Sequence, residues 1–370
     1  MQRVRVQVAP RSYDVLLERG LLRRCGRILA RLLGKRRLCF IVTVAPVLKL
    51  WGKPLKKSFG DAGLVAEFLE MGDGELHKSF RTVEALAEKM VALGADRDSV
   101  VVALGGGVVG DVAGFLAASY MRGIDFVQMP TTLLAQVDAS VGGKTGVNLK
   151  AGKNLAGAFH QPLAVLIDSE TLNTLPEREF RAGLYESLKG GVIGDPRLFR
   201  WMEENQPAIL RREGSALDPV IVASVKLKAK IVAADEREHG VRAFLNFGHT
   251  IGHALEAETG YQHFLHGEAV AWGMIAAVHI AQAAGKMKAA DADRVTSAVL
   301  SVGRLPRVTV KAERVVARLL SDKKARGGKV RFVLPKKIGA MEVVTGVSDD
   351  AARAAVEHIR RLSANQASNA

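Results

Sequence analysis

The sequence has few cysteines and few aromatic residues, and it has no long apolar run. Of its 370 residues, two are cysteines (Cys25 and Cys39) and 5% are aromatic. Two thiols outside a Cys-x-x-Cys pair exclude a small protein held together by disulfides. No stretch approaches the ~18 consecutive apolar residues of a membrane-spanning helix. We therefore expect a soluble, cytoplasmic protein.

Acidic residues are also scarce relative to basic ones. Lys and Arg number 53 against 38 Asp and Glu, which gives a net charge of +15. The basic residues occur in scattered doublets, such as Lys336 and Lys337, and form no long run. The charge therefore suits small anionic metabolites, and we expect neither nucleic acid nor a membrane as a partner.

The residues that are abundant indicate a folded chain of two domains. Hydrophobic residues make up 48% of the sequence and charged residues 25%, and there are 37 glycines. In the first half, short β-branched runs alternate with amphipathic helical periods, an order typical of a parallel α/β sheet covered by helices on both faces. The strands are expected at residues 4–8, 13–17, 37–44, 64–70, 99–104, 125–129 and 164–168. The helices between them are expected at residues 21–33, 81–93 and 112–121.

The pattern changes near residues 172–176, beyond which long helical periods dominate. These periods cover residues 177–190, 198–204, 219–234, 249–259 and 268–284. A short β signal returns at 330–334, and the small polar tail from 363 is expected to fray. The sequence therefore predicts a Rossmann-like α/β domain over residues 1–174 and a mostly helical domain over 175–370.

A glycine-rich turn joins a predicted buried strand to a predicted helix. Gly105, Gly107 and Gly110 fit the pattern G-x-G-x-x-G. Glycine lets a backbone approach a pyrophosphate, and the helix N-terminus offers free N–H donors. The acidic residue of the dinucleotide fingerprint should close the next strand, but Asp125 opens it. The turn thus indicates an anion site and not the standard fingerprint, with a purely structural turn as the alternative.

A second glycine pair lies in a segment dense in polar residues. Gly142, Gly143, Lys144 and Thr145 resemble the end of a P-loop, but Asp138 stands where that motif needs glycine. A flexible loop with a solvated lysine is the simple interpretation. The polar neighbours favour a ligand site instead, in which Lys144 and Lys153 hold a phosphate or carboxylate. These neighbours are Thr131, Thr132, Gln136, Asp138, Ser140, Asn148, Asn154 and His160.

Histidines and a carboxylate in the second half suggest a metal site. His249 and His253 are four residues apart, which places both imidazoles on one helix face. Thr250 replaces the glutamate base of the H-E-x-x-H zinc peptidases. His266 begins another helix, and Glu186 lies on an apolar helix where an unpaired charge is costly. Two histidines and a carboxylate form a catalytic zinc ligand set. The residues alone leave open which imidazoles would bind a metal and which would be hydrogen-bonded core or surface groups.

Several long motifs resemble those of the 3-dehydroquinate synthases, and together they span nearly the whole chain. Residues 103–162 contain ALGGGVVGDVAGFLAASYMRG, MPTTLLAQVDASVGGKTGVN and AGKNLAGAFHQP. Later segments read YESLK (185–189), DERE (235–238), LNFGHTIGHA (245–254) and LHGEAV (265–270). The resemblance is weakest in the first sixty residues and the tail.

The resemblance implies an activity, two cofactors and an assembly. Members convert 3-deoxy-D-arabino-heptulosonate 7-phosphate to 3-dehydroquinate and phosphate in the shikimate pathway. Transient oxidation by NAD⁺, phosphate elimination, re-reduction, ring opening and an aldol closure follow one another at a divalent metal, Zn²⁺ or Co²⁺. The fold is a Rossmann-like domain followed by a helical domain, with the active site in the cleft between them, and members are commonly homodimers.

The resemblance also assigns residues to three sets. The metal ligands are Glu186, His249 and His266. The residues that contact or react with substrate are His253, Lys144, Lys189, Arg242, Asp138, Asn154, Lys228, Asn246, Arg122 from the other subunit, and either Lys323 or Lys324, with Lys324 preferred. The NAD-binding residues are Asp73, Glu75, Lys78, Gly106, Gly107, Val108, Asp111, Thr131, Thr132, Lys144, Lys153, Thr171, Leu172 and Thr174.

One segment departs from the family pattern. After the strand that ends at Thr43, the family usually has a short polar segment with an acidic residue and asparagine. Here Thr43 is followed directly by Val44, Ala45 and Pro46. A contact to the adenosine ribose would then be missing, so we expect NAD⁺ to bind more weakly than in other members.

Three other functions remain as alternatives at this point. A related sugar phosphate cyclase would act on sedoheptulose 7-phosphate or glucose 6-phosphate. A metal-dependent polyol or alcohol dehydrogenase would release NADH. A protein that binds anions or nucleic acid without catalysis would bind DNA in a salt-sensitive manner.

Overall fold

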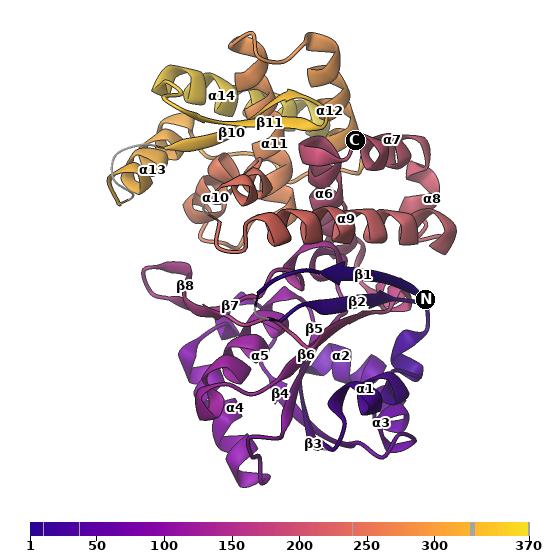
Figure 1. Ribbon diagram of the computed structural model, residues 1–370. Helices are drawn as coiled ribbons and strands as arrows, with labels where there is room; N and C mark the ends of the chain where they lie inside the picture. Colours follow the sequence, from indigo (N-terminus) through magenta and orange to yellow (C-terminus); the bar gives the residue numbers. More distant parts are fainter. Residues whose placement is uncertain (10, 37, 239, 326–329, 369–370) are drawn as a thin grey trace. The chain divides into compact units, whose positions relative to one another are not determined.

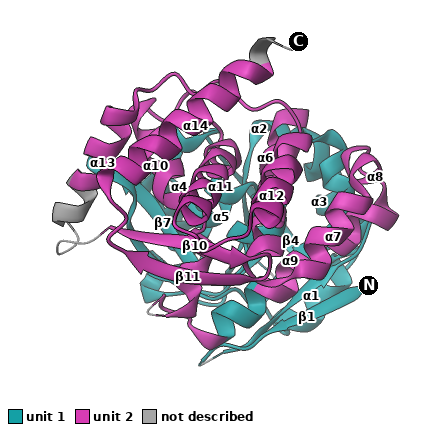
Figure 2. Cartoon of the chain, turned by 90° about the horizontal axis from the view of Figure 1, so that it is seen from above, with its two compact units in different colours: residues 1–176, 228–233 teal, residues 177–227, 234–370 magenta. Residues whose placement is uncertain are grey.

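The computed structural model describes residues 1–9, 11–36, 38–238, 240–325 and 330–368, and within 321–325 and 367–368 it describes the backbone alone. The chain divides into two compact units (Figure 2). Unit 1 comprises residues 1–176 and 228–233, and unit 2 comprises residues 177–227 and 234–370. The boundary predicted between residues 174 and 175 lies close to the first of these breaks.

Unit 1 is built on a seven-stranded sheet with the strand order β1-β2-β9-β6-β5-β3-β4. Only β1 runs antiparallel to its neighbour in this sheet; the other pairs are parallel. The strands are β1 (Gln2–Val6), β2 (Tyr13–Leu17), β3 (Leu38–Val44), β4 (Val65–Met71), β5 (Val100–Gly105), β6 (Phe126–Pro130) and β9 (Ala164–Ile167). The α/β prediction for this half of the chain is therefore confirmed.

Helices cover both faces of this sheet (Figure 1). Along β3, Cys39 and Ile41 pack with the core under α1 and α3, while Phe40 and Val42 pack with the core under α4 and α5. Successive strand side chains point to opposite faces, so a strand buried on both sides reads as a continuous apolar run. The helices are α1 (Gly26–Leu33), α2 (Ala45–Val47), α3 (Lys53–Gly60), α4 (Phe80–Ala92) and α5 (Gly107–Ser119).

The polar segment after the sixth predicted strand contains a hairpin and is not a flexible loop. β7 (Lys144–Leu149) pairs antiparallel with β8 (Gly152–Phe159). The alternative interpretation of this segment as a flexible loop was therefore wrong, although Lys144 is exposed. Its abundant glycine and polar residues hide the period-2 pattern by which a strand is normally identified.

Unit 2 is mainly helical, as predicted, with one small hairpin. Its helices are α6 (Glu177–Gly194), α7 (Pro196–Glu204), α8 (Gln206–Leu210), α9 (Gly214–Ala234, of which residues 228–233 belong to unit 1), α10 (His249–Glu258), α11 (His266–Ala283), α12 (Ala289–Ser301), α13 (Ala312–Ala325) and α14 (Asp349–Ser368). The hairpin pairs β10 (Arg331–Lys337) with β11 (Ala340–Thr345). No helix within the described ranges is both long enough and apolar enough to span a membrane.

The tail does not fray where the sequence predicted. Helix α14 continues to Ser368. Within it, the Ser363 hydroxyl is buried and accepts a hydrogen bond from the Val308 N–H at 3.1 Å. A residue that looks like part of a small polar tail is thus fixed by a contact with a distant loop, which the local composition does not reveal.

Candidate functional site

Three histidines of unit 2 form a cluster at the start of two helices. One ring nitrogen from each of His249, His253 and His266 lies within 4.8 Å of the others. His249 and His253 come from α10, and His266 is the first residue of α11. His253 is exposed, whereas His249 and His266 are partly buried.

Glycines explain why three helices meet here. A Cβ on Gly273 of α11 would lie 1.8 Å from the Gly248 carbonyl oxygen, just before α10. A Cβ on Gly267 would lie 2.0 Å from the Ala182 carbonyl oxygen of α6. Only glycine allows such close backbone approaches. Because Glu186 follows Ala182 by one helical turn, the same contacts bring its carboxylate to the histidines.

Glu186 completes a donor set that fits a divalent metal. Its Oε1 lies 4.0 Å from Nε2 of His266. Both carboxylate oxygens are buried and have no hydrogen-bond partner among the described residues, although Lys189 forms an ion pair with the carboxylate. Donor atoms that share a zinc ion lie roughly 4 Å apart or less, since each is ~2.0–2.2 Å from the metal. A buried carboxylate beside imidazole nitrogens at this spacing is what a zinc or cobalt site requires.

Hydrogen bonds at Nδ1 orient two of the imidazoles. Nδ1 of His249 lies 3.2 Å from the Phe247 carbonyl oxygen. Nδ1 of His266 lies 3.3 Å from Oε2 of Glu256, a carboxylate that is 2% exposed. A histidine that donates from one nitrogen offers the other as a ligand, so both rings present Nε2. The Nδ1 contacts of His249 and His266 therefore leave their Nε2 atoms as the nitrogens that could bind a metal.

The electrostatics of the cluster differ between these two rings. Burial, together with the Lys189 charge and the neighbouring imidazoles, holds the pKa of His249 well below its usual value. Burial also acts to lower the pKa of His266, but the hydrogen bond to Glu256 and the charges of Glu256 and Glu186 outweigh it and raise the pKa. His249 is thus neutral near pH 7, the form that binds a metal.

The glycine-rich turn of unit 1 lies where an open α/β sheet binds its ligands. β3 is followed by β4 on one side of the sheet, while β5 is followed by β6 on the other, so the strand order reverses between β3 and β5. Ligands bind at the carboxyl ends of the strands at such a switch point. β5 ends at Gly105, Gly106 precedes α5, and α5 begins at Gly107, whose added Cβ would lie 3.3 Å from Ala139 Cβ.

A polar network of unit 1 brings together residues from three of its segments. The Lys78 ammonium contacts both Asp111 Oδ2, on α5, and Asn154 Oδ1, on β8. The Asn148 amide donates to Glu75 at 2.8 Å, and its oxygen accepts from the Asn154 N–H at 2.8 Å. Burial raises the pKa of Asp111, against the charge of Lys78, which lowers it. This network thus links three residues predicted to bind NAD, namely Glu75, Lys78 and Asp111, to Asn154, which is predicted to bind substrate.

Two further predicted substrate residues meet within unit 1. Nζ of Lys228 donates to Oδ1 and to the backbone oxygen of Asp138, both at 2.5 Å. Thr131 and Thr132 follow β6, next to the glycine turn. The Thr131 N–H donates to the Gly105 oxygen at 2.9 Å.

In unit 2, Arg242 and Asn246 lie in a short 3₁₀ segment, Val241–Asn246, that precedes α10. Arg242 is 2% exposed, and its guanidinium donates to the Glu236 carbonyl oxygen. The Asn246 amide donates to Glu238 at 2.5 Å. Contacts with Glu236 and Glu238, which precede the segment, thus hold both side chains near the start of α10.

The structure leaves other predicted residues outside these groups. Lys144, Asp73 and Arg122 are exposed, while Thr171 and Leu172 are buried in unit 1. The Thr171 hydroxyl accepts from Gln136 at 3.1 Å. The side chains of Lys323 and Lys324, on α13, lie outside the described residues. The remaining members of the predicted sets, Val108, Lys153 and Thr174, lie on α5, on β8 and in the 3₁₀ helix Ser169–Thr174.

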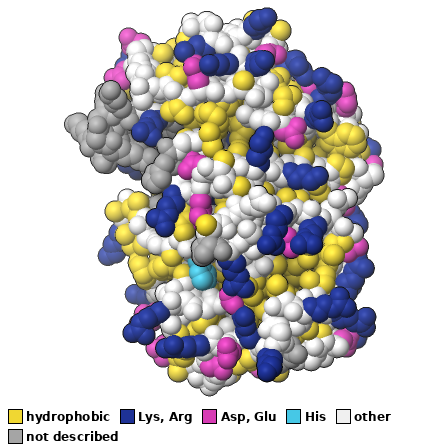
Figure 3. Space-filling view, viewed as in Figure 1, with side chains coloured by type: hydrophobic (Ala, Val, Ile, Leu, Met, Phe, Trp, Pro, Cys, Tyr) yellow, Lys and Arg dark blue, Asp and Glu magenta, His cyan; other side chains and the backbone are white. Residues whose placement is uncertain are grey.

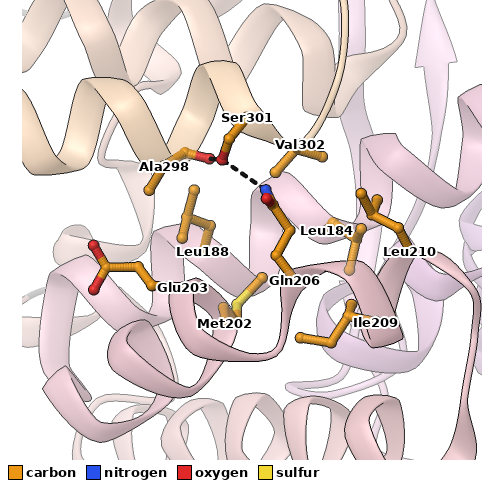
Figure 4. Close-up of a pocket in the computed structure, with 10 residues that line it drawn as sticks. All are labelled: Leu184, Leu188, Met202, Glu203, Gln206, Ile209, Leu210, Ala298, Ser301 and Val302. Carbon is orange, nitrogen blue, oxygen red and sulfur yellow. Dashed lines mark hydrogen bonds between the residues drawn. The ribbon is translucent and has the colours of Figure 1, made fainter.

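A separate pocket in unit 2 contains none of the described site residues (Figure 4). Its walls are mostly apolar side chains from α6, α7, α8 and α12. The polar groups that it contains already have partners, because Gln206 donates to Ser301 at 2.6 Å and Glu203 pairs with Arg294 at 2.6 Å. The described residues that line this pocket include no histidine, cysteine or lysine.

Sequence analysis assigned no individual role to two residues that contact the predicted site residues. Glu256 lies seven residues after His249, which is about two turns along the same face of α10. Asn148, named only as one of many polar neighbours, links Glu75 to Asn154. The spacing from His249 could have indicated Glu256, whereas the density of polar residues around Asn148 indicated a ligand site there without a role for this residue.

Family models identify both halves of the chain. The model described as 3-dehydroquinate synthase N-terminal matches residues 68–182, and the C-terminal model matches residues 183–325. The chain belongs to the 3-dehydroquinate synthase family. A 3-dehydroquinate synthase of Koribacter versatilis (strain Ellin345) is 52% identical over 98% of this chain and 99% of its own length. One of Solibacter usitatus (strain Ellin6076) is 50% identical over 93% of this chain and 95% of its own. The family that the motifs resembled is thereby confirmed.

Solved structures of sugar phosphate cyclases share the fold of this 3-dehydroquinate synthase family member. A 2-epi-5-epi-valiolone synthase from Streptomyces hygroscopicus subsp. jinggangensis 5008, with NAD⁺ and Zn²⁺ bound, is 30% identical and has a TM-score of 0.85. The match covers 96% of this chain and 99% of that one. A 2-deoxy-scyllo-inosose synthase, 24% identical over 96% of this chain and 99% of its own, also reaches 0.85 and shows the common fold.

Proposed function

We propose that this chain is a lyase that converts 3-deoxy-D-arabino-heptulosonate 7-phosphate to 3-dehydroquinate and phosphate, using NAD and a divalent metal. Membership of the family supports the reaction. The observation that carries the site is the buried Glu186 carboxylate, 4.0 Å from His266 and without a hydrogen bond among the described residues, beside three clustered imidazoles.

Glu186, His249 and His266 would hold the metal, and His253 would face the substrate. A bound Zn²⁺ or Co²⁺ would supply a Lewis acid that lowers the pKa of a substrate hydroxyl. Lys189 holds Glu186 through their ion pair, and the Phe247 carbonyl fixes the ring of His249. His253 is exposed and can therefore exchange a proton or a hydrogen bond with substrate.

The glycine turn and the Lys78 network would hold NAD, which supplies a hydride acceptor and later returns the hydride. The N–H groups at the start of α5 can bind the pyrophosphate. The role of Lys78 is to place Asp111 and Asn154 in fixed positions beside this turn. NAD contacts by Asp73, Glu75, Thr131, Thr132, Lys153 and residues 171–174 are part of the same proposal.

Cationic and amide side chains would bind the two anionic groups of the substrate. Lys144, Lys189, Lys228, Arg242, Asn154 and Asn246 are the proposed substrate-binding residues, with Lys323 or Lys324. Asp138 keeps the Lys228 ammonium oriented through two hydrogen bonds. Lys and Arg side chains are also scattered over the surface, as Figure 3 shows for one face, so only part of the +15 charge would serve the substrate.

The test is a stoichiometry measured with purified protein, Zn²⁺ and NAD⁺. We expect one phosphate and one 3-dehydroquinate per substrate consumed, without accumulation of NADH. Activity with sedoheptulose 7-phosphate or glucose 6-phosphate in its place would identify a related cyclase. Stoichiometric NADH would identify a dehydrogenase and contradict the proposal.

We also propose that the enzyme is a cytoplasmic homodimer in which Arg122 reaches the phosphate bound by the other subunit. Arg122 is exposed at the end of a short 3₁₀ helix, Tyr120–Arg122. Mixing inactive Arg122→Ala protein with inactive Glu186→Gln protein should restore activity, since each mixed dimer has one intact site. No recovery after verified subunit exchange would contradict this assignment.

A further inference from the structure

We propose that Glu256 is a positioning residue for the metal ligand His266. Its carboxylate binds Nδ1 of the ring and thereby directs Nε2 toward Glu186. This inference rests on the metal site proposed above, because it assigns a role to a residue that acts only through one of the ligands.

The geometry places His266 between two buried carboxylates. Oε2 of Glu256 lies 3.3 Å from Nδ1, and Oε1 of Glu186 lies 4.0 Å from Nε2. The side chains of Glu256 and Glu186 are 3% and 1% exposed. Each carboxylate thus faces one ring nitrogen, which fixes the rotation of the imidazole and decides which nitrogen is available as a ligand.

His266 needs this support more than His249 does. The Nδ1 of His249 is paired with the backbone carbonyl of Phe247, two residues before it, so the helix start itself orients that ring. His266 opens α11, and the partner of its Nδ1 is a side chain from α10. The orientation of His266 therefore depends on a residue that can be replaced by mutation.

Glu256 is also placed to couple the two ligand-bearing helices. It shares α10 with His249 and lies about two turns further along the same face. Its carboxylate reaches the first residue of α11. Burying a carboxylate is costly unless it is paired, so a purely apolar packing role does not account for glutamate at this position.

The test compares metal affinities of Glu256→Gln and Glu256→Ala by competition with a chromophoric chelator, in the absence of substrate. Loss of an outer partner of a ligating histidine typically weakens metal binding about 10- to 100-fold. We expect a loss of about that size for Glu256→Ala and a smaller loss for Glu256→Gln, whose amide oxygen can still accept from Nδ1. The visible absorption of the Co²⁺-loaded protein should also change, because the ligand geometry changes.

Glu258→Gln is the matched control. Glu258 lies on the same helix and pairs with Arg314 at 2.8 Å, away from the histidines. The Co²⁺ affinity of Glu258→Gln should lie within about twofold of the parent's. This change is smaller than the one expected when a hydrogen-bond partner of a ligating histidine is removed. Thermal unfolding of each metal-free variant shows whether a loss of metal affinity comes from a loss of folding. If Glu256→Ala does not fold, the metal affinity of the isosteric Glu256→Gln decides the test.

Two outcomes separate this inference from the proposed site. If Glu186→Gln and His249→Ala lose metal but both Glu256 variants bind it as tightly as the parent, the inference on Glu256 is wrong and the metal site stands. If the two ligand variants bind metal as tightly as the parent, the proposed site is wrong and the inference fails with it.

Discussion

The two units prepare different kinds of site. In unit 1 the proposed anion site is made largely from one turn, Gly105 to Gly107, whose donors are backbone N–H groups at the start of α5. In unit 2 the proposed metal site is made from side chains on three helices, α6, α10 and α11. A backbone site depends on glycine and on the course of the chain, whereas a side-chain site depends on a few irreplaceable groups. Mutations should therefore separate the two sites cleanly.

The largest expected effect comes from removing a metal ligand. Glu186→Gln and His249→Ala should each weaken Co²⁺ binding by more than about 100-fold, since a ligand contributes more than an outer-shell partner. NAD⁺ binding to unit 1 should be unchanged in both variants. Chelator competition and an NAD⁺ titration measure the two affinities on the same sample.

Glu177→Gln provides the control on the same helix as Glu186. Glu177 is exposed and pairs with Arg181 at 2.9 Å. Glu186→Gln also leaves Lys189 buried without its partner, so a loss of stability is expected for it, and His249→Ala tests the ligand assignment without that complication. An equal loss of NAD⁺ and metal affinity in His249→Ala would break the distinction between the two sites.

The next effect concerns the backbone site. Gly107→Ala places a methyl group at the start of α5, with Ala139 Cβ 3.3 Å away as its near neighbour. We expect the fold to tolerate it, while NAD⁺ affinity falls about 10-fold, which is about 1.4 kcal/mol. Metal affinity should stay at the parent value.

Gly60→Ala serves as the control for a glycine substitution in unit 1. A Cβ on Gly60, in α3, would meet no atom of the described part of the chain within 4 Å, apart from its chain neighbours and its own helix. This variant should bind NAD⁺ as the parent does. Parent-like NAD⁺ affinity in Gly107→Ala as well would mean that this turn is structural.

The segment after Thr43 predicts that the unmodified protein binds NAD⁺ more weakly than its relatives. The expected difference is similar in size to the effect of Gly107→Ala. β3 passes directly into α2, and the buried Thr43 hydroxyl has no hydrogen-bond partner among the described residues. Without a charged ribose contact, NAD⁺ should bind about 10-fold more weakly than in relatives that keep the segment. Parallel isothermal titrations of this protein and such a relative measure the difference, and equal dissociation constants would refute it.

The smallest effect lies outside both sites, at the stacked rings of His279 and His358, whose centroids are 4.3 Å apart. Burial, and the nearby Arg361 charge, lower the pKa of both from 6.5. Below that pH the unfolded chain takes up protons that the folded chain does not, so the free energy of unfolding falls as the pH drops. We expect His358→Gln to show a shallower decline in melting temperature between about pH 6.5 and 5 than the parent. The affinities for metal and NAD⁺ at pH 7.5 should not change. A melting temperature that falls with pH in the variant as steeply as in the parent would contradict this assignment.

The sequence predicted local features better than distant contacts. The central strands β3, β5, β6 and β9 are buried on both faces, so the sequence shows them as apolar runs. The glycine pattern likewise indicated the turn at Gly105. The hairpin of β7 and β8 was missed because glycine and polar residues hide its alternation. The meeting of Glu186 with His266 depends on close approaches at Gly267 and Gly273, which no local pattern reveals. The residue types suggested a metal site among Glu186 and the three histidines, but only the resemblance to a family selected the ligands among them.

The most direct test of the proposed reaction follows a deuterium atom placed on the carbon that is oxidised and then reduced again. With Zn²⁺ and unlabelled NAD⁺, the proposed reaction predicts 3-dehydroquinate that keeps the label, stoichiometric phosphate, and NAD⁺ recovered without deuterium. Deuterium found in accumulated NADH, without phosphate release, would show that the hydride is not returned and would contradict the assignment.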